Sequence, residues 1–534
     1  MSSPFPPSAR PSGADGSTSA DADTSTTADT STTEVVGNDA AGHFARGDAQ
    51  LPPLATGATT TVDATPKNAF DRFFEITRRG STVAREIRGG VVTFVTMAYI
   101  VILNPLILGG VTDVSGGALD AAQIGAATGL TAGVMTILFG VFAKLPFALA
   151  AGLGINSFLA VSVVGQVTWP EAMGLVVING LLIVLFGATG IRTAIFRAVP
   201  QALKAAITVG IGLFIAFIGF VDSGFVNRTP GGPPVQLGDN GSITSVPTLI
   251  FVFGLVLIGI LVARKVPGGI LIGIVVSTVV ALIAQSVLKL GPSFEDPNGW
   301  HMTIPELPAA WITIPDFGLI GQFDLFGAFG RVGMLSATML VFTLVFSNFF
   351  DAMGTMTGLA KNAGLAYKDG TFPRLRSAFV VEGFGAVAGG VTSTSSNTVY
   401  VDSASGIGEG ARTGLASLVV GVLFLLSMFV TPLTLVVPIE VGSAALVIVG
   451  AMMMSQIREI KFTKFAVALP AFLTIVTMPL TYSIANGIGV GFISWALVNA
   501  FSGRARKVHW LMWVVAAGFA LYFVRGPIEA MLAG

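Results

Sequence analysis

The sequence predicts an all-α polytopic membrane protein. Of its 534 residues, 53% are hydrophobic and only 11% are charged, whereas a soluble domain carries about 25% charged residues. After residue 88 the chain consists of long apolar runs, interrupted by Gly, Pro and short basic loops. Many of these runs reach the roughly 20 residues that a helix needs to cross a bilayer. A soluble core with so few charges would aggregate, so the lipid bilayer is an expected partner.

About fourteen transmembrane segments are expected, followed by one more apolar stretch at 509–524 that either crosses the membrane or lies at its interface. The predicted spans are 89–109, 122–142, 147–163, 171–190, 200–221, 245–263, 267–286, 333–359, 376–391, 397–410, 412–431, 441–455, 464–482 and 484–501.

The loop charges predict the orientation. With the N-terminus inside, the outer loops hold only Arg228, Lys289 and Arg331, plus Arg525 if the last stretch crosses. Because basic loops stay on the cytoplasmic side, we expect a multi-pass protein of the cell (plasma or inner) membrane with a cytoplasmic N-terminus. The cytoplasmic loops then hold Lys144, Arg192, Arg197, Lys204, Arg264, Lys265, Lys361, Lys368, Arg374, Arg376, Arg412, Arg458, Lys461, Lys464, Arg504, Arg506 and Lys507.

The N-terminal part differs in composition from the rest. Residues 1–66 are rich in Ser, Thr, Ala, Asp and Gly and hold almost no large apolar residues, so a disordered polar tail is expected. Residues 67–88 mix arginines with Phe70, Phe73 and Phe74, a pattern typical of an amphipathic helix on the membrane surface.

Composition disfavours several other classes of protein. The formal net charge is zero, which argues against a nucleic-acid partner, and the absence of cysteine excludes thiolate metal sites. The chain has no phosphate-binding Gly loop followed by Lys-Ser/Thr, no zinc-protease motif and no Ser/His/Asp pattern. We therefore expect neither a cofactor nor an enzymatic activity.

Fourteen spans divide into seven plus seven, and an odd number in each half places the halves in opposite orientation, as in many secondary transporters. Spans 3 and 10 occupy equivalent places in the two halves. Span 3 contains Leu149-Ala-Ala-Gly-Leu-Gly-Ile-Asn156, and span 10 follows Thr392-Ser-Thr-Ser-Ser-Asn397-Thr. These Gly- and Ser/Thr-rich stretches predict broken half-helices with their N-termini near the midplane.

Ionisable side chains inside a span are costly and are functional candidates by default. Asp351 in span 8 is the best candidate for a proton carrier, since a carboxyl in a low dielectric picks up protons more readily; the alternative is a carboxyl held protonated or bonded to neighbouring helices. Asp402 in span 10 either accepts hydrogen bonds from ring N–H groups of a ligand or caps the half-helix. Glu382 is a third proton site or pairs within the bundle.

Other polar and aromatic residues are weaker candidates. Asn156 either binds a ligand or ties span 3 to span 10. Glu409 and Arg412 are expected to form a structural ion pair. Phe158, Phe349, Phe350 and Tyr400 are placed either for ring stacking or for ordinary packing.

Several long motifs resemble one family of transporters. The chain is similar to the nucleobase–cation symporters of the xanthine/uracil permease superfamily, and most of all to the guanine/hypoxanthine/adenine permease subgroup, from about Phe70 to Arg525. The motifs are Phe74-Glu-Ile-Thr-Arg-Arg-Gly-Ser-Thr, Thr96-Met-Ala-Tyr-Ile-Val-Ile-Leu-Asn104-Pro105, Gly152-Leu-Gly-Ile-Asn156, Phe350-Asp351-Ala-Met-Gly354-Thr355, Tyr400-Val-Asp402-Ser-Ala-Ser-Gly406, Gly410-Ala-Arg412-Thr-Gly414 and Met478-Pro-Leu-Thr-Tyr482.

The resemblance implies a seven-plus-seven inverted repeat with a core and a gate domain, and short β-strands before the half-helices of spans 3 and 10. The gate domain is often used for dimerisation in this family, so a homodimer through it is an expected partner. The implied parts are a tail at 1–66, a basic amphipathic segment at 67–88, the core at 89–190 and 333–431, the gate at 191–332 and 432–503, and a C-terminal segment at 504–534.

The resemblance also implies the site. Asp351 falls on the span 8 acid and Asp402 on the span 10 acid that contacts the base, while Asn156 matches a span 3 amide and Thr355 lies one turn after Asp351. Two positions depart from the subgroup: Asn348 stands where an acid is common, and Asp402 where Glu is common. The expected substrate-binding residues are Asp351, Asp402, Asn156, Phe158, Thr355, Phe350 and Asn348, and the expected proton-coupling residues are Asp351, Asp402 and Glu382.

Together these features predict a secondary active transporter that takes up purine nucleobases (hypoxanthine, guanine or adenine) with protons by alternating access. A carrier for xanthine or uracil, an anion transporter of the same fold, and a sensor that has lost transport are the alternatives. Asp351 and Asp402 at mid-membrane speak against an anionic substrate.

Overall fold

The computed structural model describes residues 66, 68–189, 198–229, 234–239, 241–293, 298–301, 303–308, 310–367, 371–433 and 436–524. Most of the predicted tail, and the loop residues Arg192, Arg197, Lys368 and Arg525, lie outside these ranges. The helices are α1 Ala69–Phe74, α2 Val83–Met97, α3 Ile100–Gly109, α4 Ala121–Phe142, α5 Leu153–Phe158, α6 Trp169–Thr189, α8 Gln201–Asp222, α9 Val246–Ala263, α10 Gly269–Leu288, α11 Gly327–Asn362, α12 Leu375–Val391, α13 Ser403–Gly408, α14 Gly414–Ser427, α15 Ile439–Met453, α16 Phe465–Leu480, α17 Ile484–Asn499 and α18 Trp510–Phe523. The strands are β1 Leu149–Ala151, β2 Val226–Arg228, β3 Val235–Leu237 and β4 Asn397–Val399.

Within these ranges, ten helices are long and apolar enough to cross a membrane, counting α2 and α3 as one. The predicted number of fourteen is therefore not reached on length alone. The four remaining predicted spans correspond to α5, α12, α13 and α16, which are shorter. Two of these, α5 and α13, are the half-helices that the Gly- and Ser/Thr-rich stretches predict.

The first span begins earlier than predicted. Helix α2 starts at Val83, inside the predicted surface segment 67–88, because the Thr82 side chain accepts a hydrogen bond from the backbone N–H of Arg85 and caps the helix. The surface helix is only α1, capped by Asn68 through the N–H of Asp71 at 2.8 Å.

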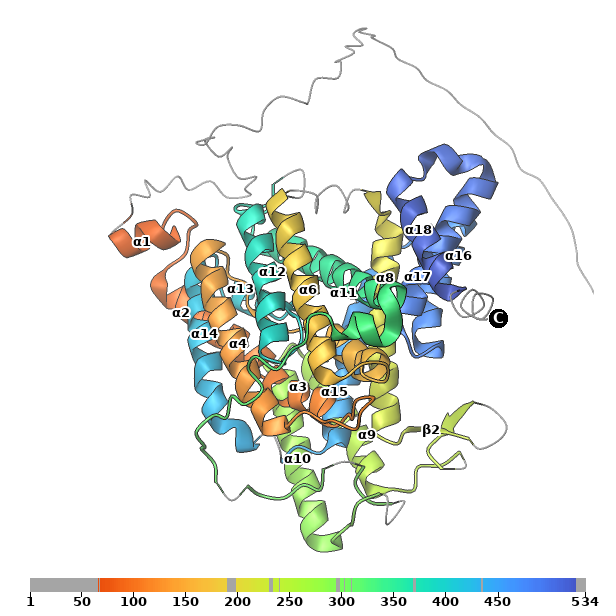
Figure 1. The fold of residues 1–534 in the computed structure, drawn as a ribbon. Helices are drawn as coiled ribbons and strands as arrows, with labels where there is room; N and C mark the ends of the chain where they lie inside the picture. Colours follow the sequence, from red (N-terminus) through yellow and green to blue (C-terminus); the bar gives the residue numbers. More distant parts are fainter. Residues whose placement is uncertain are drawn as a thin grey trace, which may run out of the picture. The chain divides into compact units, whose positions relative to one another are not determined.

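The main helix contacts between the two halves of the chain each have an equivalent contact in which the halves have swapped roles. Helix α4 (span 2) packs on α14 (span 11), and α12 (span 9) packs on α6 (span 4). In the same way, α2 contacts α13 and α14, while α11 contacts α5 and α6. Figure 1 shows this interleaving as helices from the red-to-yellow half beside helices from the green-to-blue half. A two-fold exchange of this kind is the signature of an inverted repeat.

The helices form two groups that pack chiefly among themselves. The first group consists of α2–α6 and α11–α14, and the second of α8–α10 and α15–α17. Contacts between the groups run mainly through α5, α8 and α11. The C-terminal helix α18 packs on α17 and α11, where Phe519 meets Phe342 edge-on.

The predicted strands before the half-helices are present. Strand β1 pairs with β4 in antiparallel register, Leu149 opposite Val399 and Ala151 opposite Asn397. All six residues are buried, so this pair closes the backbone hydrogen bonds of two segments that are not helical inside the membrane region.

Close contact between α4 and α14 depends on glycine. A Cβ added to Gly414 would overlap the carbonyl O of Gly140, and one added to Gly140 would lie 2.5 Å from the carbonyl O of Gly414. We expect Gly414→Ala to destabilise the fold by about 3 kcal/mol through overpacking, measured as a lower melting temperature in detergent. Gly358→Ala, on α11 with open space around it, is the control and should leave the melting temperature unchanged or raise it. An unchanged Gly414→Ala protein would contradict the close crossing.

The segment before α11 is anchored to the second group by His301. Its backbone N–H and its ring Nδ1 both lie 3.0 Å from Glu440 Oε1, on the buried side chain of α15. The preceding Trp300 donates its Nε1–H to Gln285 Oε1 of α10 at 2.9 Å. The hydrogen bond and charge of Glu440, with further contributions from Asp222 and Asp239, raise the pKa of His301 above its ordinary value, although burial opposes this.

This anchor should make stability depend on pH. Since the folded-state pKa of His301 is raised, its contribution is complete below the unfolded value of about 6.5 and is lost as pH rises through the folded value. We expect the melting temperature of the native protein to fall across this window relative to that of His301→Gln. Parallel pH curves for the two proteins would argue against the anchor.

Near Glu409, the predicted ion pair is wrong. Glu409 pairs with Arg88 of α2 at 2.9 Å, and Arg412 instead donates to the carbonyl groups of Ile407 and Ala411. Glu86 accepts the backbone N–H groups of Arg412 and Thr413. The prediction paired Glu409 with Arg412 because the two are close in sequence. In the fold, α2, which is distant in sequence, packs against this turn and supplies the actual partner.

Candidate functional site

A cavity of about 410 Å³ lies between the two groups of helices. One wall comes from the first group: Tyr99 between α2 and α3, the start of α5, and the segment from β4 to Asp402. The other wall comes from α8 and α15 of the second group, including Thr208, Ile211 and Met452. Helix α11 of the first group completes the wall with Ser347, Asp351 and Thr355. The cavity is thus built where the halves of the chain and the groups of helices meet.

The two predicted acids face this one cavity from different elements. Asp351 projects from the middle of α11, the equivalent of span 8, with Thr355 one turn later. Asp402 stands directly before α13 and is buried. Asp351, Asp402 and Thr355 thus line the same cavity.

Asp402 does not cap its half-helix. Its side chain makes no capping hydrogen bond to α13. Instead, the Tyr99 hydroxyl donates to Asp402 Oδ2 at 3.3 Å. This arrangement leaves the other carboxylate oxygen available to accept a hydrogen bond from a ligand.

Two hydroxyl groups in the cavity wall lack hydrogen-bond partners. Ser347 Oγ and Thr398 Oγ1 are buried and have no hydrogen-bond partner among the described residues. Buried polar atoms are normally satisfied, so these two hydroxyl groups on the cavity wall are available to hydrogen-bond a ligand. Neither residue was predicted, because isolated Ser and Thr in apolar spans are common and carry no distinguishing pattern.

Asn156 bonds directly to α3, and it is linked to the stretch before β4 only through Asn104. Its side-chain amide donates to Asn104 Oδ1, and Asn104 donates to Thr128 Oγ1 at 2.7 Å and to the carbonyl O of Thr394 at 3.2 Å. The amide network joins α5, α3, α4 and the Ser/Thr-rich stretch before β4, and Asn156 is absent from the described lining of the cavity.

Asn348 acts in a similar way. Its amide donates to Ser396 Oγ at 2.9 Å, which ties α11 to the stretch before β4. Asn348 does not line the cavity in the part of the chain that the structure describes. Glu382 on α12 is fully buried and is absent from the described lining of the cavity.

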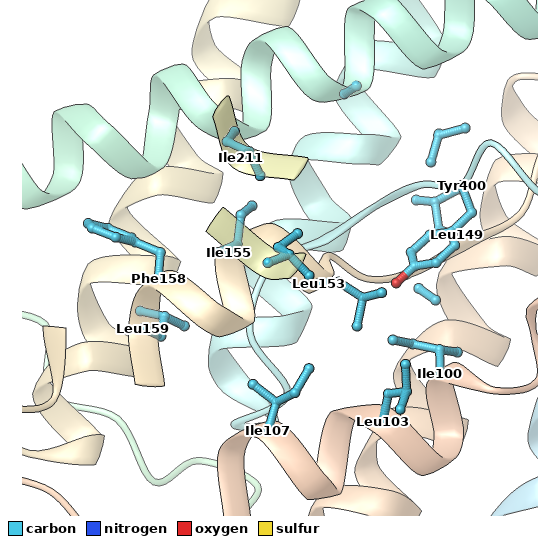
Figure 2. Packing of buried hydrophobic residues seen from close by; sticks show 14 of the residues in the cluster. Ile100, Leu103, Ile107, Leu149, Leu153, Ile155, Phe158, Leu159, Ile211 and Tyr400 are labelled. Carbon is cyan, nitrogen blue, oxygen red and sulfur yellow. The ribbon is translucent and has the colours of Figure 1, made fainter. Parts of the chain in front are cut away.

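The predicted stacking residues mostly pack elsewhere. Phe158 is buried in the apolar core, and Figure 2 shows it separated from Tyr400 by Ile155 and Leu153. Phe350 packs edge-on against Phe346 and Phe349. Among the described cavities, Phe350 lines a smaller one of about 60 Å³, which shares Asp351 and Thr355 with the main cavity and also reaches Lys204. The aromatic rings on the main cavity are Tyr99 and Tyr400.

A cavity lined by two carboxyl groups and bounded by paired half-helices is the arrangement that many membrane transporters with inverted repeats have at their centre. Residues 84–490 match the model of the Permease family of xanthine/uracil permeases. The chain belongs to this family.

Curated relatives match over most of their length. The chain is 37% identical to guanine/hypoxanthine permease PbuG of Bacillus subtilis, over 85% of this chain and 99% of that one. It is 36% identical to adenine permease AdeQ of Escherichia coli, over 85% of this chain and 96% of that one. These relatives are permeases and not enzymes.

Among solved structures, the transmembrane domain of a cyanobacterium bicarbonate transporter, BicA, is similar with a TM-score of 0.54. The two share 17% identity over 75% of this chain and 96% of that domain. At this identity the likeness concerns the fold, the inverted repeat of seven plus seven segments.

Proposed function

We propose that this permease takes up purine nucleobases together with protons. The observation that carries the proposal is the pairing of Asp351 and Asp402 on one cavity between the two helix groups. Carboxylates accept hydrogen bonds from ring and exocyclic N–H groups, and the unpartnered hydroxyls of Ser347 and Thr398 suit the remaining polar edge of a base. Guanine/hypoxanthine and adenine permeases among the relatives support a purine substrate.

Asp351 is the proposed proton carrier and Asp402 the proposed substrate acid. Asp351 lines both the main cavity and the smaller one that reaches Lys204 near the start of α8, which supports a role in proton transfer. Asp402 is held by Tyr99, which orients one carboxylate oxygen and leaves the other for the base. Glu382, buried on α12 and outside the described lining of the cavity, is a further proposed proton-coupling residue.

Transport would proceed by alternating access. The first helix group, as core, carries both acids, and the second group, as gate, supplies the facing wall of Thr208, Ile211 and Met452. Movement of one group against the other would open the cavity to each side in turn.

A cluster of basic residues supports the proposed orientation of the protein in the membrane. Arg79 donates to the carbonyl groups of Lys144 and Arg412, and Arg374 lies 3.6 Å from Glu75. Loops distant in sequence thus meet at one basic end of the helix bundle. By the positive-inside rule this end would face the cytoplasm of a cell membrane, together with the N-terminus.

The test is uptake of labelled hypoxanthine, guanine, adenine, xanthine and uracil in cells that lack their own base permeases, with and without a protonophore. Uptake of a purine base that collapses with the protonophore is expected, and the ranking would identify the substrate. Uptake of uracil or xanthine alone would exclude the purine assignment, and uptake insensitive to the protonophore would exclude proton coupling.

A further inference from the structure

A second hollow lies away from the transport cavity, where α4, α6 and α12 meet. It has a volume of about 460 Å³ and shares none of its described lining residues with the cavity between the helix groups. Leu138 and Phe142 of α4 and Val380 and Phe384 of α12 supply its apolar lining. Phe142 and Phe384 are 55% and 49% exposed. Because these helices cross the membrane, such exposed rings face lipid rather than water, and the hollow is a groove that opens to the bilayer.

The groove is polar at one end only. Arg376 and Ser377, in the first turn of α12, line that end. One guanidinium nitrogen of Arg376, Nη2, donates to the carbonyl O of Ala188 at 2.6 Å, at the C-terminal end of α6. This bond fixes the side chain across the mouth of the groove. The other guanidinium N–H groups have no hydrogen-bond acceptor among the described residues, so a fork suited to phosphate oxygens is left open.

The polar end of the groove lies at the same end of the helix bundle as the cluster of basic residues around Arg79. Arg376 belongs to the same loop end as Arg374, which interacts with Glu75 beside Arg79. Anionic phospholipids gather next to such basic ends on the cytoplasmic leaflet, and basic pockets between transmembrane helices bind their head groups. Charge complementarity therefore favours an anionic amphiphile over a zwitterionic one.

We propose that this groove binds an anionic glycerophospholipid. The phosphate would accept hydrogen bonds from the Arg376 guanidinium and the Ser377 hydroxyl, and one acyl chain would lie along Leu138, Val380 and Phe384. A free phosphate compound would lack the apolar contacts, and a neutral lipid would lack the charge. The proposal needs only that the chain lies in a membrane; it is independent of the substrate and of proton coupling.

The experiment uses the full chain, purified in detergent and depleted of lipid. Phosphatidylglycerol and phosphatidylcholine with identical acyl chains are added separately, and bound lipid is counted by native mass spectrometry alongside the melting temperature. We expect phosphatidylglycerol to bind about tenfold more tightly, because both lipids present a phosphate to Arg376 but phosphatidylcholine also brings its positively charged ammonium group next to the basic cluster. Equal binding of the two lipids would overturn the proposal, and so would a melting-temperature rise with glycerol phosphate alone.

Two variants and a control locate the site. Arg376→Gln should remove the preference for phosphatidylglycerol, and Val380→Trp, which fills the groove without changing charge, should reduce binding of this lipid by a similar factor. Arg264→Gln removes an exposed arginine after α9, outside the groove, and should keep the preference. A preference that survives in Arg376→Gln, or phosphatidylglycerol binding that is unchanged in Val380→Trp, would overturn the assignment, whatever the transport assay gives.

Discussion

Replacing Asp351 by Asn is expected to abolish proton-driven accumulation of a purine base. The amide has nearly the same shape as the carboxyl group but cannot gain and lose a proton, so the return of the carrier would no longer be linked to proton movement. Net uptake should fall more than about 100-fold, the scale on which a missing proton-transfer group acts. Exchange of external for internal base, which needs no net proton movement, should fall by much less.

The measurement is a pair of assays in the same vesicles: uptake driven by an imposed proton gradient, and exchange against preloaded base. Glu409→Gln is the control, since it removes an acid whose partner is Arg88, outside the cavity, and a surface pair of this kind contributes at most about 1 kcal/mol to stability. Protonophore-sensitive accumulation by Asp351→Asn would remove Asp351 from the proton pathway.

Replacing Asp402 by Asn is expected to weaken substrate binding rather than coupling. A hydrogen bond to a charged acceptor contributes about 1.5–3 kcal/mol, and Asn would also turn an N–H donor toward the N–H groups of the base. The KM for uptake and that for exchange should therefore rise together by about 10–100-fold, with sensitivity to the protonophore retained.

Two neighbouring variants sharpen this result. Tyr99→Phe removes only the hydroxyl that donates to Asp402 Oδ2, so its effect on KM should be several-fold smaller. Asp402→Glu keeps a carboxylate at this position and should retain uptake. Unchanged affinity in Asp402→Asn would place the base elsewhere in the cavity.

The sequence alone identified what depends on composition and local pattern. The apolar runs marked nearly every helix to within a few residues, since a span has to be both long and apolar. Gly- and Ser/Thr-rich stretches located the half-helices α5 and α13, and motif resemblance placed Asp351, Asp402 and Thr355 in one site. These features are encoded over short stretches, where residue type and backbone preference act directly.

Only the tertiary structure decided which side chains share a space. Asn156 and Asn348 hold segments together instead of lining the cavity, and Phe158 packs in the core. Tyr99 reaches Asp402 across 303 residues of sequence, and Glu409 pairs with Arg88 rather than with nearby Arg412. The physical reason is that a polar group inside a membrane protein has to find its partner in three dimensions. Asp402 and Glu409 find their partners in the other half of the repeat. Asn156 and Asn348 find theirs on another segment of the same half. No local sequence pattern records either kind of contact.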